Sequence, residues 1–182
     1  SNYVVTPASA TLDMSNQSFT VSTWFKTPAN QTDKILVEHS VWSDAGTYQL
    51  TLSGTNLLRF TWPSYYGQYA GTPDANVTYA DNKWHHFVGV FDNSTKIATT
   101  YFDGVLKTTQ GSITSGPTSA TVATYIGDRG AAGGYFFTGS LDDVRIYNRA
   151  LSAGEVAQLY RQGQAKANKS PTSLLTGGLV GP

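Results

Sequence analysis

Two glutamates are the residues of this chain whose carboxylates could break a glycosidic bond. A retaining glycoside hydrolase needs two carboxyl groups about 5–5.5 Å apart, one as nucleophile and one as acid/base. Glu38 is the only glutamate of its segment, and Glu155 follows Ser152 by three positions, which is the spacing of a helix capping box. Asp142 and Asp143 are adjacent, so in a strand they would point to opposite faces. We therefore predict no catalytic pair and no enzyme activity.

Aromatic and polar side chains in two segments could instead hold a sugar. The apolar C–H faces of sugar rings stack on aromatic rings, while amides, carboxylates and guanidinium groups bind the hydroxyls. Residues 62–73 contain three tyrosines and two prolines and are predicted to form a loop at the rim, and residues 127–134 form a glycine-rich loop. A structural role for the first loop stays open, because such loops also close the end of a sandwich. The candidate ligand-binding residues are Trp42, Asp44, Trp62, Tyr65, Tyr66, Tyr69, Arg129 and Tyr135, with Gln49 and Asn56 as further polar groups. Asp44 or Asp128 could also donate to a calcium at the loop rim.

Short strands separated by turn residues must position these side chains. Residues 19–25 alternate between apolar and polar positions, and Leu58, Phe60 and Trp62 form one face of a later strand. Residues 84–91 are apolar on both faces, which predicts a central strand. The pair Asp103-Gly104 lies between two β-rich runs and predicts a hairpin turn. Since no helical pattern separates the strands, we predict antiparallel sheets packed as a sandwich.

One short helix is predicted near residues 152–161. Ser152 is its expected N-cap, with Glu155 as the capping-box partner. An apolar stripe follows at Val156, Leu159 and Tyr160, and Gly163 is the expected stop. The strand before it, with Val144 and Ile146 on one face, is predicted to be buried.

Composition agrees with a single extracellular β domain. The chain has 182 residues, of which only 13% are charged and 13% are aromatic. Twelve basic and twelve acidic residues cancel, so charge gives no reason to expect nucleic acid or an anionic membrane as a partner. No apolar run is long enough to insert into a bilayer. The absence of cysteine excludes disulfides and is compatible with a secreted or cell-surface location, although it does not separate that from the cytosol.

Four motifs follow one another at residues 18–25, 84–92, 101–105 and 137–152. The last, FTGSLDDVRIYNRALS, joins a strand directly to a helix start. In type and order these motifs resemble LamG-like domains of the concanavalin A-like lectin and glucanase superfamily, over roughly residues 1–160. The resemblance implies an all-β, two-sheet antiparallel jelly-roll sandwich with one short helix.

The same resemblance implies a non-catalytic carbohydrate-binding or adhesion module of a larger secreted or cell-surface protein. It also implies a structural calcium with Asp142 as a ligand, although the family's second acidic ligand, in an N-terminal Asp-x-Ser-Gly loop, is missing from this sequence. The alternative is a structural spacer or a protein-binding repeat without a glycan ligand. An exposed aromatic platform favours the first interpretation, and burial of the aromatic candidates favours the second.

The resemblance also divides the chain. Residues 1–161 are predicted to form the LamG-like jelly roll, and residues 162–173 read as a linker. Residues 174–182 resemble the first strand of such a domain, placed at the opposite end of the chain. This tail is expected either to close this domain as a permuted strand or to begin a following repeat.

Overall fold

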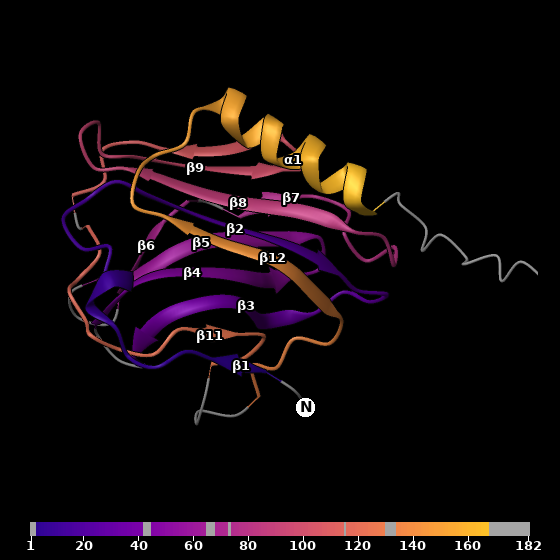
Figure 1. Ribbon diagram of the computed structural model, residues 1–182, viewed down its shortest axis with the longest axis horizontal. Coiled ribbons are helices and arrows are strands. Elements are labelled where there is room, and N and C mark those ends of the chain that lie inside the picture. The colour runs from indigo at the N-terminus through magenta and orange to yellow at the C-terminus, as the bar shows by residue number, and fades with distance from the viewer. Residues whose placement is uncertain are drawn as a thin grey trace, which may run out of the picture.

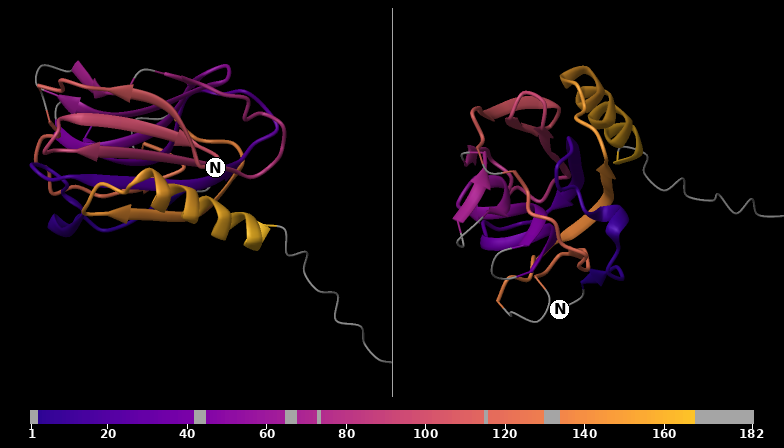
Figure 2. Two further views of the ribbon diagram at one scale, coloured as in Figure 1. Left: turned by 90° about the horizontal axis from the view of Figure 1, so that it is seen from above. Right: turned by 90° about the vertical axis from the view of Figure 1, so that its left-hand side faces the viewer.

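Two antiparallel sheets packed face to face form the molecule, which confirms the predicted all-β sandwich (Figures 1 and 2). The computed structural model describes residues 3–41, 45–64, 68–72, 74–114, 116–129 and 134–167. The predicted tail at residues 174–182 lies outside this part of the chain. A single 3-10 helix turn, η1 (Ala10–Leu12), precedes the first long strand.

Within the described residues the larger sheet has seven strands. Its order is β1 (Val4–Val5), β11 (Tyr125–Ile126), β3 (Thr32–Val41), β4 (Ala45–Gly54), β5 (Leu57–Ser64) and β6 (Gln68–Gly71), and β7 (Ala75–Asn76) also pairs with β5. Along β4 the residues alternate strictly, so Tyr48 and Leu50 enter the core while Gln49 and Thr51 face outward. The larger sheet therefore presents one apolar and one polar face.

The smaller sheet has five strands in the order β10 (Val105–Gln110), β9 (Ile97–Phe102), β8 (His85–Asp92), β2 (Phe19–Lys26) and β12 (Ser140–Tyr147). β8 lies between β9 and β2, so the predicted central strand is confirmed. Asp103 and Gly104 join β9 to β10 with φ values of 52° and 76°. Positive φ at both positions is the geometry of a two-residue type I′ hairpin, as the Asp-Gly pair predicted.

The core contains Trp62, which corrects one sequence prediction. Trp62 is fully buried, with its ring centroid 4.9 Å from that of Phe91 and 5.6 Å from that of Phe60. Because it shares the inward face of β5 with Leu58 and Phe60, its ring cannot serve as an exposed platform for a sugar. The proposed stacking role of Trp62 is therefore wrong.

β12 is a half-buried edge strand, not the buried strand that was predicted. Within the described residues it pairs with β2 alone, and the register shifts between Asp142 and Arg145. Asp143 occupies this bulge with a φ of 49°, and both of its carboxylate oxygens accept hydrogen bonds from Arg145, at 2.8 and 2.7 Å. The bulge interrupts the simple alternation that placed Asp142 and Asp143 on opposite faces. Leu141, Val144 and Ile146 still pack against the core.

Helix α1 (Ala153–Ala167) covers the outer face of the smaller sheet (Figure 2). Its capping box is confirmed, since the Glu155 carboxylate accepts from the Ser152 backbone N–H at 2.8 Å and the Ser152 hydroxyl accepts from the Glu155 N–H at 3.3 Å. The helix runs to Ala167, so Gly163 is not the stop and residues 162–167 are helical rather than linker. A Cβ at Gly163 would lie 2.3 Å from the Trp24 ring, so glycine permits this close packing. None of the helices in the described ranges has the length and apolarity to cross a membrane.

Two buried histidines predict a loss of stability in mild acid. Burial lowers the pKa of both His39 and His86 to about 4, and His86 lies beneath α1 with its ring stacked on Trp24 at 5.1 Å. In the unfolded chain a histidine has an ordinary pKa of about 6.5, so both side chains bind protons below that pH. In the folded chain they stay neutral until about pH 4. The free energy of unfolding therefore falls as the pH drops from 6.5 toward 4. His85 opposes this trend, because bonds with Asp81 and Asp103 outweigh its burial and raise its pKa.

We expect the free energy of unfolding to fall by about 2–3 kcal/mol between pH 7 and pH 5, since each lowered histidine pKa contributes up to ~1.4 kcal/mol per pH unit. Urea denaturation at the two pH values measures this difference. A His86→Gln variant should lose more than half of this net pH dependence, because its side chain does not titrate and the opposing effect of His85 remains. Equal stability of the wild-type protein at pH 7 and pH 5 would contradict the assignment.

Candidate functional site

Polar side chains in register cross the outward face of the larger sheet. Glu38 of β3 lies opposite Gln49 of β4, and Gln49 lies opposite Thr61 of β5. Thr51 and Arg59 form the next row. Although this face points away from the core, Glu38 is only 1% exposed, Gln49 3%, Thr61 5% and Thr51 7%. Polar groups this deeply buried indicate a lined site rather than an ordinary solvated surface.

The segment between β11 and β12 folds over the edge of this sheet. Gly127 donates a backbone hydrogen bond to Leu36 at 3.0 Å, and Ile35 donates one to Tyr135 at 3.1 Å. A third bond, from the Phe137 N–H to the Gly127 carbonyl at 3.0 Å, holds the two ends of the segment together. These bonds bring Arg129 and Tyr135 from a glycine-rich stretch onto the face of β3 and β4.

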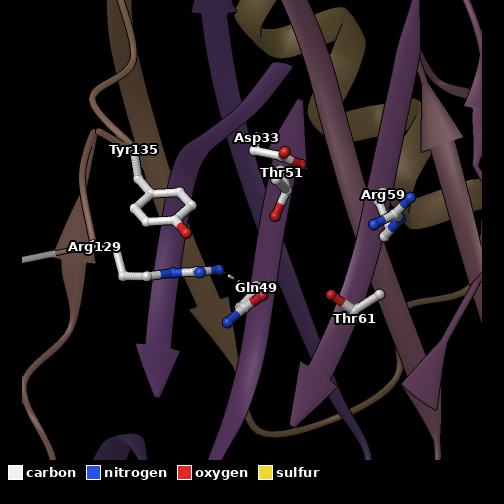
Figure 3. Close-up of a pocket in the computed structure, with 7 residues that line it drawn as sticks. All are labelled: Asp33, Gln49, Thr51, Arg59, Thr61, Arg129 and Tyr135. Carbon is white, nitrogen blue, oxygen red and sulfur yellow. Dashed lines mark hydrogen bonds between the residues drawn. The ribbon is translucent and has the colours of Figure 1, made fainter. Parts of the chain in front are cut away.

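The sheet and this segment border a cavity of about 260 Å³ that is open to solvent on one side. In Figure 3, Arg129 and Tyr135 stand on one side, Arg59 and Thr61 on the other, and Gln49 and Thr51 lie between them. The Arg129 guanidinium lies 4.3 Å from the centre of the Tyr135 ring, which is a cation–π contact. The lining residues are Asp33, Gln49, Thr51, Arg59, Thr61, Arg129 and Tyr135.

The structure thus brings together three residues that the sequence singled out, namely Arg129, Tyr135 and Gln49. Sequence reasoning missed the other lining residues. The alternation of side chains between the two faces of a strand could have identified them. Thr51 lies on the same face of β4 as Gln49, and Arg59 and Thr61 alternate with the apolar residues of β5. Whether such a polar face is solvated or enclosed depends on distant segments, so their burial could not be read from the strands alone.

Glu38 and Arg129 form a buried ion pair beneath the cavity. Arg129 Nε lies 3.1 Å from Glu38 Oε2, and Gln49 Nε2 donates to Glu38 Oε1 at 2.7 Å. Ser40 also donates its hydroxyl to Glu38. Burial raises the pKa of Glu38 above its usual value, and the positive charge of Arg129 acts in the opposite direction. Glu38 is therefore bound on both oxygens by structural partners, which does not fit a hydrolytic nucleophile.

A second ion pair borders the opposite side of the cavity. Arg59 contacts both oxygens of Asp74, with Nε at 2.6 Å and Nη2 at 3.0 Å, and Ser53 donates to the same carboxylate at 3.1 Å. Burial alone would raise the pKa of Asp74, but the bonds with Arg59 outweigh it and lower the pKa. This bidentate geometry fixes the guanidinium at the wall.

The hydroxyl of Thr51 is the unsatisfied group of the site. Its Oγ1 is buried and has no hydrogen-bond partner among the residues that the structure describes. A buried polar atom without a partner costs about 1–3 kcal/mol, so such atoms are uncommon in proteins. Oγ1 is closed to water, so a ligand hydroxyl would reach it only if the Thr51 side chain turned toward the cavity that the residue lines.

The remaining sequence candidates lie elsewhere or outside the description. Asn56 lies in the turn between β4 and β5, where its N–H bonds to Asn30, and Asp128 is fully buried next to Arg129. Tyr69 belongs to β6, and the position of its side chain is outside the description. Trp42, Asp44, Tyr65 and Tyr66 also fall outside the described residues.

The calcium expected at Asp142 stays a prediction. The Asp142 side chain accepts the N–H of Asp143 at 2.7 Å, while the Asp143 carboxylate is taken by Arg145. Across the ranges given above, no three side chains of His, Cys, Asp and Glu gather to hold a metal ion. The side chains present do not by themselves fit a calcium site, which uses 6–8 oxygen ligands. Melting curves in calcium and in EGTA, for the wild type and for Asp142→Asn, test the expectation.

Comparisons with known proteins agree with this fold. A family model described as "Concanavalin A-like lectin/glucanases superfamily" matches residues 1–157. A comparison with curated proteins finds no match. The binding domain of Paraclostridial Mosquitocidal Protein 1 superposes with a TM-score of 0.68 at 18% identity, covering 88% of this chain and 41% of that one.

Two structures of the botulinum neurotoxin DC binding domain are also similar. One, in complex with SialylT, has a TM-score of 0.58 at 17% identity, covering 82% of this chain and 36% of the other. The second, in complex with rat synaptotagmin II, has a TM-score of 0.64 at 15% identity, covering 88% and 40%. The chain thus spans less than half of the length of each of these structures, and at such identities the likeness shows the fold alone.

Proposed function

Because this chain belongs to the concanavalin A-like lectin/glucanase superfamily, we propose that it is a non-catalytic binding module whose ligand is a glycan. The ligand would lie in the cavity over β3, β4 and β5. The observation that supports this proposal is the set of nearly fully buried polar side chains on the outward face of the larger sheet, gathered around open space. A sheet face that nothing covers would leave such groups in water.

The chemistry of the lining suits a sugar ring. Tyr135 supplies an aromatic surface, and Gln49, Thr51 and Thr61 supply amide and hydroxyl groups at spacings set by the strands. The volume of about 260 Å³ lies below the ~300–1,000 Å³ of pockets for drug-sized ligands. The cavity therefore suits one small polar unit, such as the terminal residue of a longer glycan.

Both glutamates have structural partners, which supports binding without bond cleavage. Glu38 is bound by Arg129, Gln49 and Ser40, and Glu155 caps α1. Neither carboxylate is available as the nucleophile of a retaining glycosidase. We also propose that the domain belongs to a larger secreted or cell-surface protein, because the similar toxin structures are binding domains of longer chains.

A protein ligand is the second candidate. It is favoured by the likeness to a neurotoxin binding domain that was solved with rat synaptotagmin II, while the same domain was also solved with SialylT. The two candidates differ in where the ligand would bind, since a protein needs a wide contact surface of about 800 Å² per partner and not only a small cavity.

We expect Thr51→Val to weaken glycan binding about 3- to 10-fold, the usual value of one hydrogen bond. The variant removes the buried hydroxyl and keeps the branched shape, and that hydroxyl has no partner among the described residues, so its loss should not destabilise the fold. Calorimetric titration with the best glycan from an array measures the change.

The matched control is Thr47→Val on the same strand. Its hydroxyl is likewise buried without a partner in the described residues, and Thr47 does not line the cavity. It should leave the affinity unchanged. Equal affinities of Thr51→Val and the wild type would argue against a ligand in this cavity.

A further inference from the structure

Resting on the proposed function, we infer that this cavity selects uncharged glycans and rejects glycans whose terminal sugar carries a carboxylate, sulfate or phosphate. The inference comes from the charged groups that line or support the cavity. These are the guanidinium groups of Arg59 and Arg129 and the carboxylates of Asp33, Glu38 and Asp74.

Both guanidinium groups already have carboxylate partners. Arg129 is held by Glu38, whose side chain is 1% exposed, and Arg59 binds Asp74 in a bidentate pair. Each guanidinium keeps further N–H groups, but a carboxylate already offsets its positive charge, so an anionic sugar gains a full ion pair only by displacing that carboxylate. Displacing Glu38 would leave a buried carboxylate without a counter-ion, which is strongly unfavourable.

Asp33 adds a third negative charge at the mouth of the cavity. It is exposed, lines the cavity, and acts electrostatically on Arg59 together with Asp74. The carboxylates therefore outnumber the guanidinium groups around this space. Among these five groups an incoming anion meets one more negative than positive charge, and like charges repel.

Uncharged hydroxyls meet no such obstacle. A hydroxyl donates one hydrogen bond and accepts others, so it can donate to the exposed Asp33 carboxylate. A carboxylate accepts only, so it gains nothing from Asp33. The lining thus favours a neutral hexose-like unit over the corresponding acidic sugar.

The test is calorimetric titration of the wild-type domain with matched oligosaccharide pairs. One pair ends in glucose or glucuronate, and the other ends in galactose or in galactose capped by sialic acid. We expect the neutral member of at least one pair to bind at least about tenfold more tightly than its acidic partner. Asp33→Asn should reduce that ratio at low salt, whereas Asp92→Asn, which makes the same charge change at the end of β8 in the other sheet, should keep it.

An acidic member that binds as tightly as its neutral partner, with amide shifts at Gln49 and Thr51, would overturn the charge selection and leave the glycan site standing. An unchanged ratio in Asp33→Asn would also overturn it. If no glycan of either charge binds, or binding shifts amides on another surface, the proposed function itself fails.

Discussion

Trp62→Ala is expected to lower the free energy of unfolding by about 3–5 kcal/mol, the usual cost of removing a large aromatic side chain from a core. Trp62 is completely buried and packs against Phe19, Phe60 and Phe91, which come from both sheets. Its removal leaves a cavity between the sheets, where surrounding rings cannot fully collapse. Urea denaturation of the wild type and the variant gives the difference.

Trp62→Phe is the matched control, since it keeps an aromatic ring and creates a smaller void. It should cost clearly less than Trp62→Ala. A cost below about 1 kcal/mol for Trp62→Ala would show that the ring is not part of a tightly packed core. A loss of glycan binding in Trp62→Ala would therefore not show that Trp62 contacts the glycan, because the variant is expected to destabilise the fold.

Arg129→Ala is expected to destabilise the protein by about 3–5 kcal/mol, the cost of leaving a buried charge without its partner. Glu38 is 1% exposed, and Arg129 is the cation that lies 3.1 Å from its carboxylate. With Arg129 removed, burial would raise the pKa of Glu38 further, because the opposing positive charge is gone. Denaturation at pH 7 measures the loss.

The double variant Arg129→Ala with Glu38→Gln should recover much of that stability. A neutral glutamine needs no counter-ion and can still bond with Gln49 and Ser40. If the double variant is no more stable than Arg129→Ala alone, the cost does not come from the unpaired Glu38. Recovery of stability without recovery of glycan binding would separate the two roles of Arg129.

The fold could be predicted because its signals are local or strongly periodic. The Asp103-Gly104 turn, the Ser152–Glu155 capping box and the apolar β8 each act within a few residues, and each is found as expected. The error on α1 was also local. Glycine often ends helices, so the sequence predicts a stop at Gly163, whereas the residue lies inside α1 and allows contact with Trp24, which is distant in the sequence.

The site was only partly predictable because its walls come from separate regions. The residue types of Arg129, within the glycine-rich stretch, and of Tyr135, directly after it, predict ligand contacts. Their placement over β4 depends on backbone hydrogen bonds to Ile35 and Leu36, which the sequence does not reveal. Trp62 lies on the same face of β5 as Phe60, so strand alternation predicts a buried ring at this position. The same two-residue repeat along β5 predicts that Arg59 and Thr61 face outward, toward the site.

The most direct test of the account is an assigned amide NMR titration of the wild-type domain with the neutral glycan that binds best on an array. The account predicts saturable shifts concentrated at Gln49, Thr51, Thr61 and Tyr135, with smaller changes along β12 and α1. Shifts centred on another surface, or an array on which no glycan binds, would contradict it.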